Sequence, residues 1–210
     1  KGGLNFRPVI DYTYDGVMKS FEQSLIRLNV DHIDLCLIHD VDYFTHGNQF
    51  EYYFNQSLKG AYAALQKLKD QNLIKGIGLG LNDADVANKF LSAEEFDCVL
   101  LAGRYTLLDQ SANNGFLQTA KRKKIGVIMA GIFNSGILAK GIKKSTYFYK
   151  PISKSIHKKY SQINNLCQKF NIPIQAAAIQ FPLKNKTISS IILGMDDVNE
   201  INQNLNFLNY

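Results

Sequence analysis

An imidazole and two carboxylates follow a short apolar run and could supply acid–base chemistry. The run at 33–38 ends at His39, and Asp40 and Asp42 come next. A compact apolar run is typical of a buried strand, so we expect His39 at the carboxyl end of a strand in a parallel sheet. Ligands bind at that end of such sheets, and imidazole donates or carries protons near neutral pH. For His39 alone, a hydrogen-bonded rim residue is an equally good interpretation.

Other apolar runs end in polar side chains as well. Asn82 follows the glycine-spaced run at 74–81, and Arg104 and Tyr105 close the run that begins at residue 96. The run at 125–131 leads into the loop at 132–136. Glycines at 76, 78 and 80 do not open a helix as a dinucleotide-binding fingerprint does, so they indicate close backbone packing in a crowded sheet.

Helical and strand patterns alternate along the chain. We expect helices at 15–28, 56–70, 83–91, 115–123, 153–170, 173–183 and 196–208, and strands at 33–39, 74–82, 96–105, 125–131 and 189–194. The long aromatic loop at 41–54, which includes Tyr43, is a candidate substrate loop. Alternating apolar strands and helices predict an α/β fold with a parallel sheet. Five such units in 210 residues, with an opening Lys1-Gly2-Gly3 that lacks an initiator Met, suggest one partial (β/α)8 TIM barrel over 1–210, N-terminally truncated and lacking most of strands 1–3.

Composition excludes several classes of protein. The chain is 46% hydrophobic and 20% charged, which predicts a sizeable core rather than disorder, and it has no run of 18 apolar residues that would span a membrane. The net charge of +6 comes from scattered lysine runs without interleaved aromatics, so we expect solvated surfaces and no nucleic-acid partner. Cys36, Cys98 and Cys167 lie far apart, without metal-ligand spacing. They predict reduced thiols in a cytoplasmic protein.

From residue 11 to residue 204, the sequence resembles the aldo-keto reductases. The resemblance is carried by ordered motifs at 22–28 and 31–35, Leu37-Ile38-His39, Gly76-Ile77-Gly78 ahead of Asn82, 104–108, and Gly194 with Asn204 downstream. It implies a (β/α)8 barrel that transfers hydride between a nicotinamide dinucleotide and a carbonyl or alcohol. Segments 39–42, 101–108 and 133–138 are most similar to the NAD-using sugar branch, the D-threo-aldose 1-dehydrogenases and L-fucose dehydrogenases, with pyridoxal 4-dehydrogenase close by. The sequence does not indicate which sugar or small aldehyde is the substrate, or an oligomeric state.

The resemblance implies two members of the family's Asp-Tyr-Lys-His catalytic tetrad. His39 matches the histidine that hydrogen-bonds the substrate oxygen, and Lys1 matches the lysine at the end of the third strand. An ammonium near the family's tyrosine favours its phenolate and lowers its pKa. The tyrosine and aspartate precede that lysine in the family and have no match here. We therefore expect this chain alone not to catalyse hydride transfer at a normal rate. Asp40, Asp42, Tyr43, Arg104 and Tyr105 are the expected substrate-loop residues.

The resemblance also implies a set of cofactor contacts. Asn82 matches the asparagine that binds the nicotinamide carboxamide, whereas the family's glutamine partner falls at Ala102 and its stacking tyrosine at Ala130. Phe133 is a candidate replacement for the stacking ring. The further cofactor-binding residues are the pyrophosphate-wrapping Asn134, Ser135 and Gly136, the strand-end Gly194, and the adenine contacts Gln203 and Asn204.

Acidic residues after the last strand bear on the choice of cofactor. NADP-using relatives place Lys and Arg there to hold the 2′-phosphate, but here the matching positions are Gly194 and Glu200, with Asp196 and Asp197 nearby. Carboxylates repel a phosphate dianion and accept hydrogen bonds from a free ribose hydroxyl. The sequence therefore predicts NAD rather than NADP.

Two other functions stay open. A metal-dependent barrel hydrolase could use His39, Asp40, Asp42 and His46, but the other strand ends supply Asn82, Arg104, Ala130 and Gly194, which are a poor ligand set, so we expect no metal. A non-catalytic cofactor-binding or interaction module is the other alternative. It is favoured by the unmatched tyrosine and by Ala130.

Overall fold

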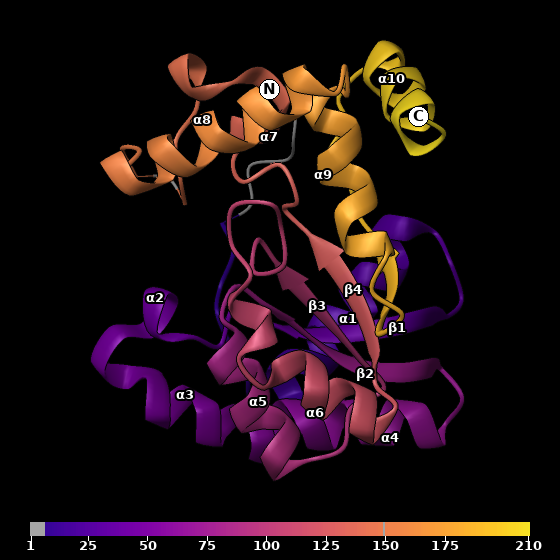
Figure 1. The fold of residues 1–210 in the computed structure, drawn as a ribbon. Coiled ribbons are helices and arrows are strands. Elements are labelled where there is room, and N and C mark those ends of the chain that lie inside the picture. Colours follow the sequence, from indigo (N-terminus) through magenta and orange to yellow (C-terminus); the bar gives the residue numbers. More distant parts are fainter. Residues whose placement is uncertain (1–6, 149) are drawn as a thin grey trace. The chain divides into compact units, whose positions relative to one another are not determined.

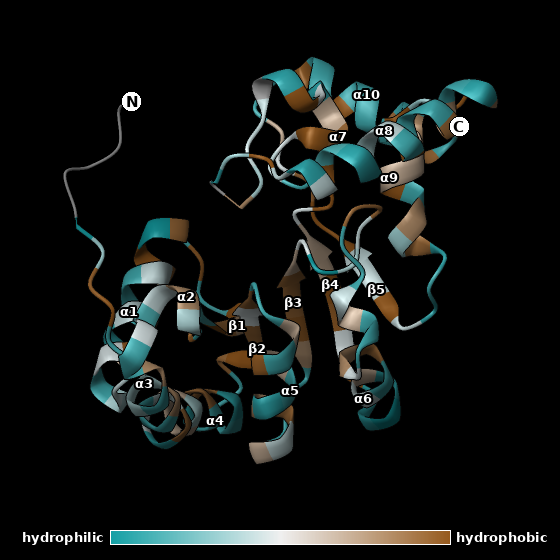
Figure 2. Cartoon of the chain, turned by 60° about the vertical axis from the view of Figure 1, so that its left-hand side comes forward, coloured by the Kyte–Doolittle hydropathy of each residue, from teal (hydrophilic) through white to brown (hydrophobic). Residues whose placement is uncertain are grey.

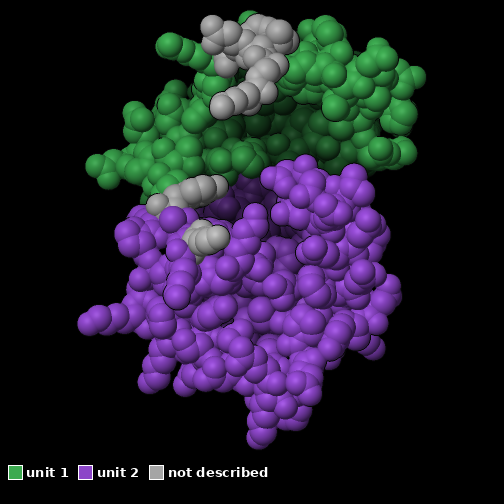
Figure 3. All heavy atoms as spheres, turned by 90° about the horizontal axis from the view of Figure 1, so that it is seen from above, with its two compact units in different colours: residues 1–78 green, residues 79–210 purple. Residues whose placement is uncertain are grey.

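A computed structural model describes residues 7–148 and 150–210 of the chain. The elements are labelled along the chain in Figure 1. The chain divides into two compact units, Lys1–Gly78 and Leu79–Tyr210 (Figure 3). Each unit contains strands and helices in alternation, which confirms the predicted α/β class. The candidate site residues are divided between the two units, so each unit is described separately.

Unit 1 contains a helix, a strand and a long helical segment. Its elements are α1 (Tyr14–Leu28), β1 (Ile33–His39), α2 (Tyr43–His46), the 3₁₀ turn η1 (Gly47–Gln49), α3 (Phe50–Gln56), the π-helical segment η2 (Ser57–Tyr62), α4 (Ala63–Asp70) and the start of β2 (Ile74–Leu81). Thr13 caps α1 by accepting a hydrogen bond from the Gly16 backbone, and Asn29 ends it in the left-handed conformation.

The segment predicted as a loop at 41–54 is largely helical. Asp42 caps α2 by accepting from the Thr45 backbone N–H at 2.8 Å, and α3 begins at Phe50. Phe50 and Phe54 are buried, and aromatic residues at this i, i+4 spacing form one helix face. The helical structure predicted from residue 56 therefore begins at Phe50. The buried aromatic residues form its inner face, and polar residues between them form its outer face.

Strand β1 is less buried than its apolar sequence predicts. Only Ile38 among its residues is buried, and the other six are exposed or partly covered. Asp34 on this strand pairs with Lys75 at 2.6 Å, which lowers the pKa of the Asp34 carboxyl through that hydrogen bond and the ammonium charge. A carboxylate on the strand thus stays at the surface, paired with a lysine.

Unit 2 contains the remaining strands and most of the helices. Its elements are the end of β2, α5 (Ala84–Ala93), β3 (Cys98–Ala102), η3 (Ser111–Asn113), α6 (Phe116–Lys123), β4 (Gly126–Ala130), α7 (Ile137–Lys140), η4 (Ile142–Lys144), α8 (Lys154–Lys169), α9 (Ile174–Leu183), β5 (Ile188–Ile191) and α10 (Val198–Leu208). Strands β3 and β5 end earlier than predicted. Arg104 and Tyr105 therefore lie in the segment after β3, and Gly194 lies in the segment after β5.

The sheet of unit 2 is parallel, as predicted. Strand β3 pairs with β4 and β4 pairs with β5, with Ala102 opposite Ala130 at the last step of the first pair. Val99 and Leu101 on β3, and Val127 and Met129 on β4, are almost fully buried. Figure 2 shows the hydrophobic colouring of β3. Because parallel strands end at the same edge, the loops after β3, β4 and β5 lie together.

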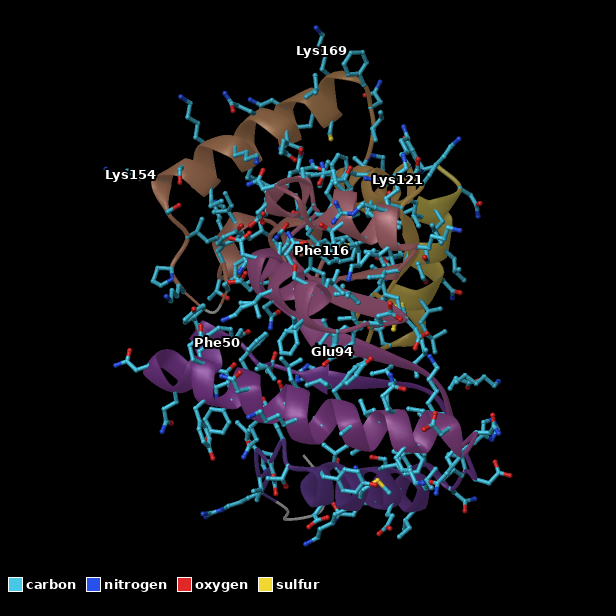
Figure 4. All side chains as sticks on the ribbon, turned by 90° about the horizontal axis from the view of Figure 1, so that it is seen from below. Phe50, Glu94, Phe116, Lys121, Lys154 and Lys169 are labelled. Atoms are coloured by element: carbon cyan, nitrogen blue, oxygen red, sulfur yellow. The ribbon has the colours of Figure 1, made fainter. Side chains whose placement is uncertain are left out.

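The basic side chains of unit 2 are spread over its surface. Lys121 on α6 is exposed, and so are Lys154 and Lys169 at the two ends of α8 (Figure 4). Dispersed cations of this kind form solvated faces rather than one continuous basic patch. Within the described residues, none of the helices is both long and apolar enough to cross a bilayer. The three cysteines are free thiols, and Cys98 and Cys167 are buried.

Candidate functional site

A cavity of about 390 Å³ opens at the carboxyl ends of β4 and β5 in unit 2. Its walls come from the loop after β4, from α7, from the segment after β5 and from α10. The lining residues are Gly131, Ile132, Phe133, Asn134, Ser135, Gly136, Ala139, Lys140, Gln175, Ile192, Leu193, Gly194, Glu200, Gln203, Asn204 and Phe207. This lining contains every predicted cofactor-binding residue except Asn82. The sequence prediction and the cavity therefore coincide in location.

The loop after β4 presents polar groups to this cavity. Asn134, Ser135 and Gly136 all have positive φ, at 48°, 56° and 91°. The loop is held by hydrogen bonds from Asn134 N to Gly131 O at 2.9 Å and from Ile137 N to Asn134 O at 3.2 Å. Backbone turns can present N–H groups to an anion. Because the Asn134 and Ile137 N–H groups bond within this turn, the candidates for a ligand are those of Ser135 and Gly136.

Gly131 lets this loop begin tight against β3. Its φ is +61°, and a Cβ there would lie 3.2 Å from the Gly103 backbone nitrogen, so a side chain would be both strained and crowded. The Gly103 nitrogen also donates to Ala130 O at 2.8 Å. Ala102 and Ala130 stand opposite each other on the paired strands, so the smallest side chains lie where these two strands end.

The opposite wall of the cavity is formed after β5. A Cβ built on Gly194 has no neighbour within 4 Å, so its backbone is open to a ligand. Asp197 caps α10 by accepting from the Glu200 backbone N–H at 2.8 Å. The cap fixes the first turn of α10, and Gln203 and Asn204 follow on the same helix and line the cavity.

Carboxylates form an acidic edge on this wall. Glu200 Oε2 accepts from the Asp196 backbone N–H at 3.3 Å, and Glu200 Oε1 lies 3.6 Å from Lys140 Nζ on α7. Among the described residues, Asp196, Asp197 and Glu200 are the one group of three or more His, Cys, Asp or Glu side chains whose ligand atoms all lie within 4.8 Å of one another. His39, Asp40, Asp42 and His46 do not form such a group, so the described structure gives no support to the hydrolase alternative.

Arg104 is held by its own surroundings. Its Nε donates to the Asn82 backbone oxygen at 2.5 Å, and its Nη1 donates to Asp109 Oδ2 at 3.2 Å. Its guanidinium lies 4.1 Å from the centroid of the Phe148 ring, which is a cation–π geometry. Arg104 thus has a structural role, because it contacts three separate segments of unit 2, and its predicted contact with substrate stays a prediction.

Asp109 and Tyr147 complete this network and were not expected from the sequence. Burial raises the pKa of the Asp109 carboxyl, but hydrogen bonds from Ser111 and the Arg104 charge outweigh it, so its pKa lies below the usual value. The Tyr147 hydroxyl donates to Asp109 Oδ2 at 3.3 Å, and burial beside that carboxylate raises the pKa of Tyr147 to about 12. Asp109 and Tyr147 are 38 residues apart, so no local pattern signals their pairing.

Tyr105 packs within unit 2. Its ring lies 4.9 Å from the Phe181 ring of α9, and its hydroxyl accepts a hydrogen bond from Asn185 Nδ2 at 3.3 Å. Its side chain is thus engaged with α9 and the turn after that helix.

In unit 1, His39 is the last residue of β1, as predicted. Its Nδ1 lies 3.2 Å from Asp40 Oδ2, and its side chain is 70% exposed, so its ring is open to a ligand. The hydroxyl of the buried Tyr12 donates to His39 O at 2.9 Å and lies 3.0 Å from His46 Nε2. Burial, and then the charges of Asp40 and Asp42, raise the pKa of Tyr12. Tyr12 therefore keeps its hydroxyl proton and holds the end of β1 through its hydrogen bond to His39 O.

Asp42 and Tyr43, two predicted substrate-loop residues of unit 1, differ in their exposure to solvent. Asp42 is 2% exposed and serves as the α2 cap, while Tyr43 is exposed and its hydroxyl is 3.4 Å from Glu51 Oε1. Asp42 thus has a structural role that is enough to explain its position, and Tyr43 is open to solvent. Lys1 lies outside the described residues.

Comparison with known proteins identifies a family that has this kind of fold. Residues 7–210 match the model of the aldo/keto reductase family. The chain belongs to this family. Solved structures agree in fold: an aldo-keto reductase from Bacillus halodurans in its holo form superposes with a TM-score of 0.71 at 16% identity, over 96% of this chain and 64% of that one.

Two curated relatives are more similar in sequence. Pyridoxal 4-dehydrogenase from Microbacterium luteolum is 41% identical over 97% of this chain, and D-threo-aldose 1-dehydrogenase from a Pseudomonas species is 30% identical over 94% of it. The chain spans 60% and 58% of the length of these two relatives. The sequence motifs had indicated a resemblance to D-threo-aldose 1-dehydrogenases, with pyridoxal 4-dehydrogenase close by, and both enzymes are among these relatives.

Proposed function

We propose that the cavity of unit 2 binds a nicotinamide dinucleotide. The observation that carries this proposal is that Phe133, the Asn134 to Gly136 turn, Gly194 and the amides of Gln203 and Asn204 line one cavity. The polar groups of the cavity fit the parts of a dinucleotide. Backbone N–H groups of the turn can bind the pyrophosphate, and the open backbone at Gly194 admits close approach of the ligand. The side-chain amides of Gln203 and Asn204 can pair with the edge of adenine. Asn82 is assigned to the carboxamide.

We further propose an oxidoreductase of the aldose-dehydrogenase type, acting on a sugar or small aldehyde in the cytoplasm, with the sheet as part of a (β/α)8 barrel. The dinucleotide supplies or accepts the hydride when bound. The relatives named for oxidation of pyridoxal and of D-threo-aldoses support this substrate class. His39 is the proposed donor to the substrate oxygen, supported by its exposed ring and its Asp40 partner at the end of β1. Lys1 is the proposed neighbour of the family's tyrosine.

The acidic edge favours NAD over NADP. Glu200 lines the cavity, and Asp196 and Asp197 begin the same wall. A 2′-phosphate placed there would meet like charges, whereas a ribose hydroxyl can donate to a carboxylate. Lys140 is the one lysine of the lining, and its pairing with Glu200 reduces its attraction for a phosphate.

Fluorescence titration with NADH and NADPH tests this proposal. We expect NADH to bind more tightly than NADPH. Glu200→Gln should strengthen NADPH binding by about three- to tenfold and change NADH binding less, because it removes a negative charge and frees Lys140. Asp85→Asn, which removes an exposed carboxylate on α5, is the matched control and should change neither affinity. Tighter binding of NADPH by the unmodified protein would refute the preference.

A non-catalytic binding module is the second candidate. It is favoured by the facing alanines Ala102 and Ala130, which stand where the family resemblance implies a glutamine and a tyrosine. The discriminating measurement is NAD-dependent sugar oxidation by the purified 210-residue chain. We expect dinucleotide binding without turnover at a normal rate. Turnover at a rate typical of enzymes, about 1 per second or more, would overturn that expectation and exclude the module.

A further inference from the structure

The side-chain amide of Asn134 is a buried polar group without a partner. Asn134 is 3% exposed, and neither its Nδ2 nor its Oδ1 has a hydrogen-bond partner among the described atoms. Its backbone N and O are both hydrogen-bonded, to Gly131 and Ile137. A buried amide left unpaired is costly, so its presence calls for an explanation. A ligand that completes both hydrogen bonds would provide one.

The backbone does not require an asparagine at this position. Asn134 has a φ of 48°, a conformation that glycine adopts without strain and asparagine tolerates. A glycine there would keep the turn and would leave no orphaned amide. The feature that distinguishes Asn134 is therefore the amide itself, on a residue that lines the cavity.

The amide lies beside the paired ends of β3 and β4. Its Nδ2 is 3.8 Å from the position that a Cβ on Gly103 would take, and Gly103 directly follows Ala102. Ala102 and Ala130 face each other across the strand pair and offer no polar atoms beyond their backbone. Asn134 thus brings a polar side chain to strand ends where both paired residues are alanine.

The chemistry of the orphaned atoms selects the ligand group. A phosphate has only acceptor oxygens, so it would pair with Nδ2 and leave Oδ1 facing negative charge. A primary carboxamide carries a donor and an acceptor side by side and can satisfy both atoms of a facing amide. In a nicotinamide dinucleotide, that group is the carboxamide of the nicotinamide ring.

We propose that Asn134 binds the nicotinamide carboxamide through its side-chain amide, with Oδ1 accepting from the ligand NH₂ and Nδ2 donating to the ligand carbonyl. This inference rests on the proposed dinucleotide function. Both amide atoms are shut off from solvent and the residue lines the cavity, so this assignment requires the Asn134 side chain to rotate toward the ligand on binding. The carboxamide has two N–H donors, so Asn82 can share it. The assignment moves the Asn134 side chain from the central pyrophosphate, where sequence resemblance put it, to the nicotinamide end of the ligand.

Binding measurements with three ligands test the assignment by calorimetry. The ligands are NAD⁺, 3-acetylpyridine adenine dinucleotide, in which a methyl group replaces the carboxamide NH₂, and ADP-ribose, which lacks the nicotinamide ring. Asn134→Gly keeps the left-handed turn and removes the amide. Asn171→Gly makes the same substitution at an exposed left-handed residue (φ 54°) that does not line the cavity, and it is the matched control.

We expect Asn134→Gly to weaken NAD⁺ binding about tenfold and to leave ADP-ribose binding within twofold. The unmodified protein should prefer NAD⁺ to the acetylpyridine analogue, and the variant should lose most of this preference. Asn134→Asp, which replaces Nδ2 by an acceptor oxygen at unchanged size, should also weaken NAD⁺. Asn171→Gly should behave like the unmodified protein. Thermal unfolding of each variant checks that it is folded.

Three results would overturn the inference, and they differ from a failure of the proposed function. An equal loss of NAD⁺ and ADP-ribose binding in Asn134→Gly would place the amide at the pyrophosphate or ribose. An unchanged NAD⁺ affinity, or an unchanged preference over the acetylpyridine analogue, would show that the amide does not touch the carboxamide. If the unmodified protein binds none of the three ligands, the proposed function itself fails, and the assignment of Asn134 fails with it.

Discussion

Individual polar side chains at the strand ends divide into those that hold the structure and those that face a cavity. Arg104 and Tyr105 were both expected to meet a substrate, yet both have partners within unit 2. Gln203 and Asn204 were expected to meet adenine, and they line the cavity. Sequence motifs locate residues on a loop or a helix, but an intramolecular partner such as Asp109 becomes visible only when distant segments are brought together.

The Asp109 network makes a prediction about stability. Asp109→Asn should lower the free energy of unfolding by about 1.5–3 kcal/mol at pH 7, because Arg104 and Tyr147 lose a charged acceptor. The folded-state pKa of Asp109 is lowered, so its contribution is present above the unfolded value of about 4 and is lost as pH falls toward the folded value. Urea unfolding at pH 7 and at pH 3 measures both effects.

The difference between Asp109→Asn and the unmodified protein should therefore be large at pH 7 and small at pH 3. Asp85→Asn, at an exposed position, should change stability by no more than about 0.5 kcal/mol at either pH. A constant difference across this pH range would mean that the Asp109 charge does not stabilise the fold.

Helices and strands show what the sequence could and could not predict. The alternation of strands with helices and the parallel pairing of β3, β4 and β5 follow from the local hydrophobic pattern. The helical structure in 43–56 was missed because its aromatic and polar residues are also typical of loops, and only burial of Phe50 and Phe54 distinguishes the two. The π-helical segment η2 has no sequence signal of its own.

The π-helical segment carries a close backbone contact at Gly60. A Cβ there would lie 2.4 Å from Tyr12 O and 2.9 Å from Thr13 Cα, and both are backbone atoms. Gly60→Ala should lower stability by about 1–3 kcal/mol, despite the higher helix propensity of alanine, because the backbone ahead of α1 must shift. Chemical denaturation followed by circular dichroism measures the change.

Lys59→Ala, at an exposed position one residue earlier, is the control for Gly60→Ala. It should leave stability within about 0.5 kcal/mol of the unmodified protein. Equal or greater stability of Gly60→Ala would show that the approach of this segment to residues 12–13 is not a tight contact in solution.

At the scale of the whole chain, net charge and fold class limit the partners. The formal charge of +6 comes with lysines at dispersed positions: Figure 4 shows Lys121 on α6, and Lys154 and Lys169 at opposite ends of α8. A match over residues 7–210 to the aldo/keto reductase family is consistent with a small-molecule ligand. The sequence motifs sufficed to name this family because they are distributed over nearly the whole chain. They could not separate the roles of Asn134 and Ser135, because adjacent residues share one motif.

Dispersed charge predicts weak binding to nucleic acid. In fluorescence anisotropy with a labelled 20-base-pair duplex, we expect no saturable binding at micromolar protein in 0.15 M salt, because scattered lysines contact few phosphates at once. The NADH titration in the same buffer is the positive control for folded protein. Binding in the nanomolar range at this salt would contradict the interpretation of these lysines as solvated surface.

The central claim is that the cavity after β4 and β5 holds a nicotinamide dinucleotide, and two-dimensional NMR of the ¹⁵N-labelled chain tests it most directly. On addition of NADH, the account predicts shifts of the backbone amide signals of Ser135, Gly136, Gly194, Gln203 and Asn204, all of which line the cavity, with the signal of Asn171 unchanged. NADH that leaves the signals of these five residues in place, or that shifts only residues outside the lining, would contradict the account.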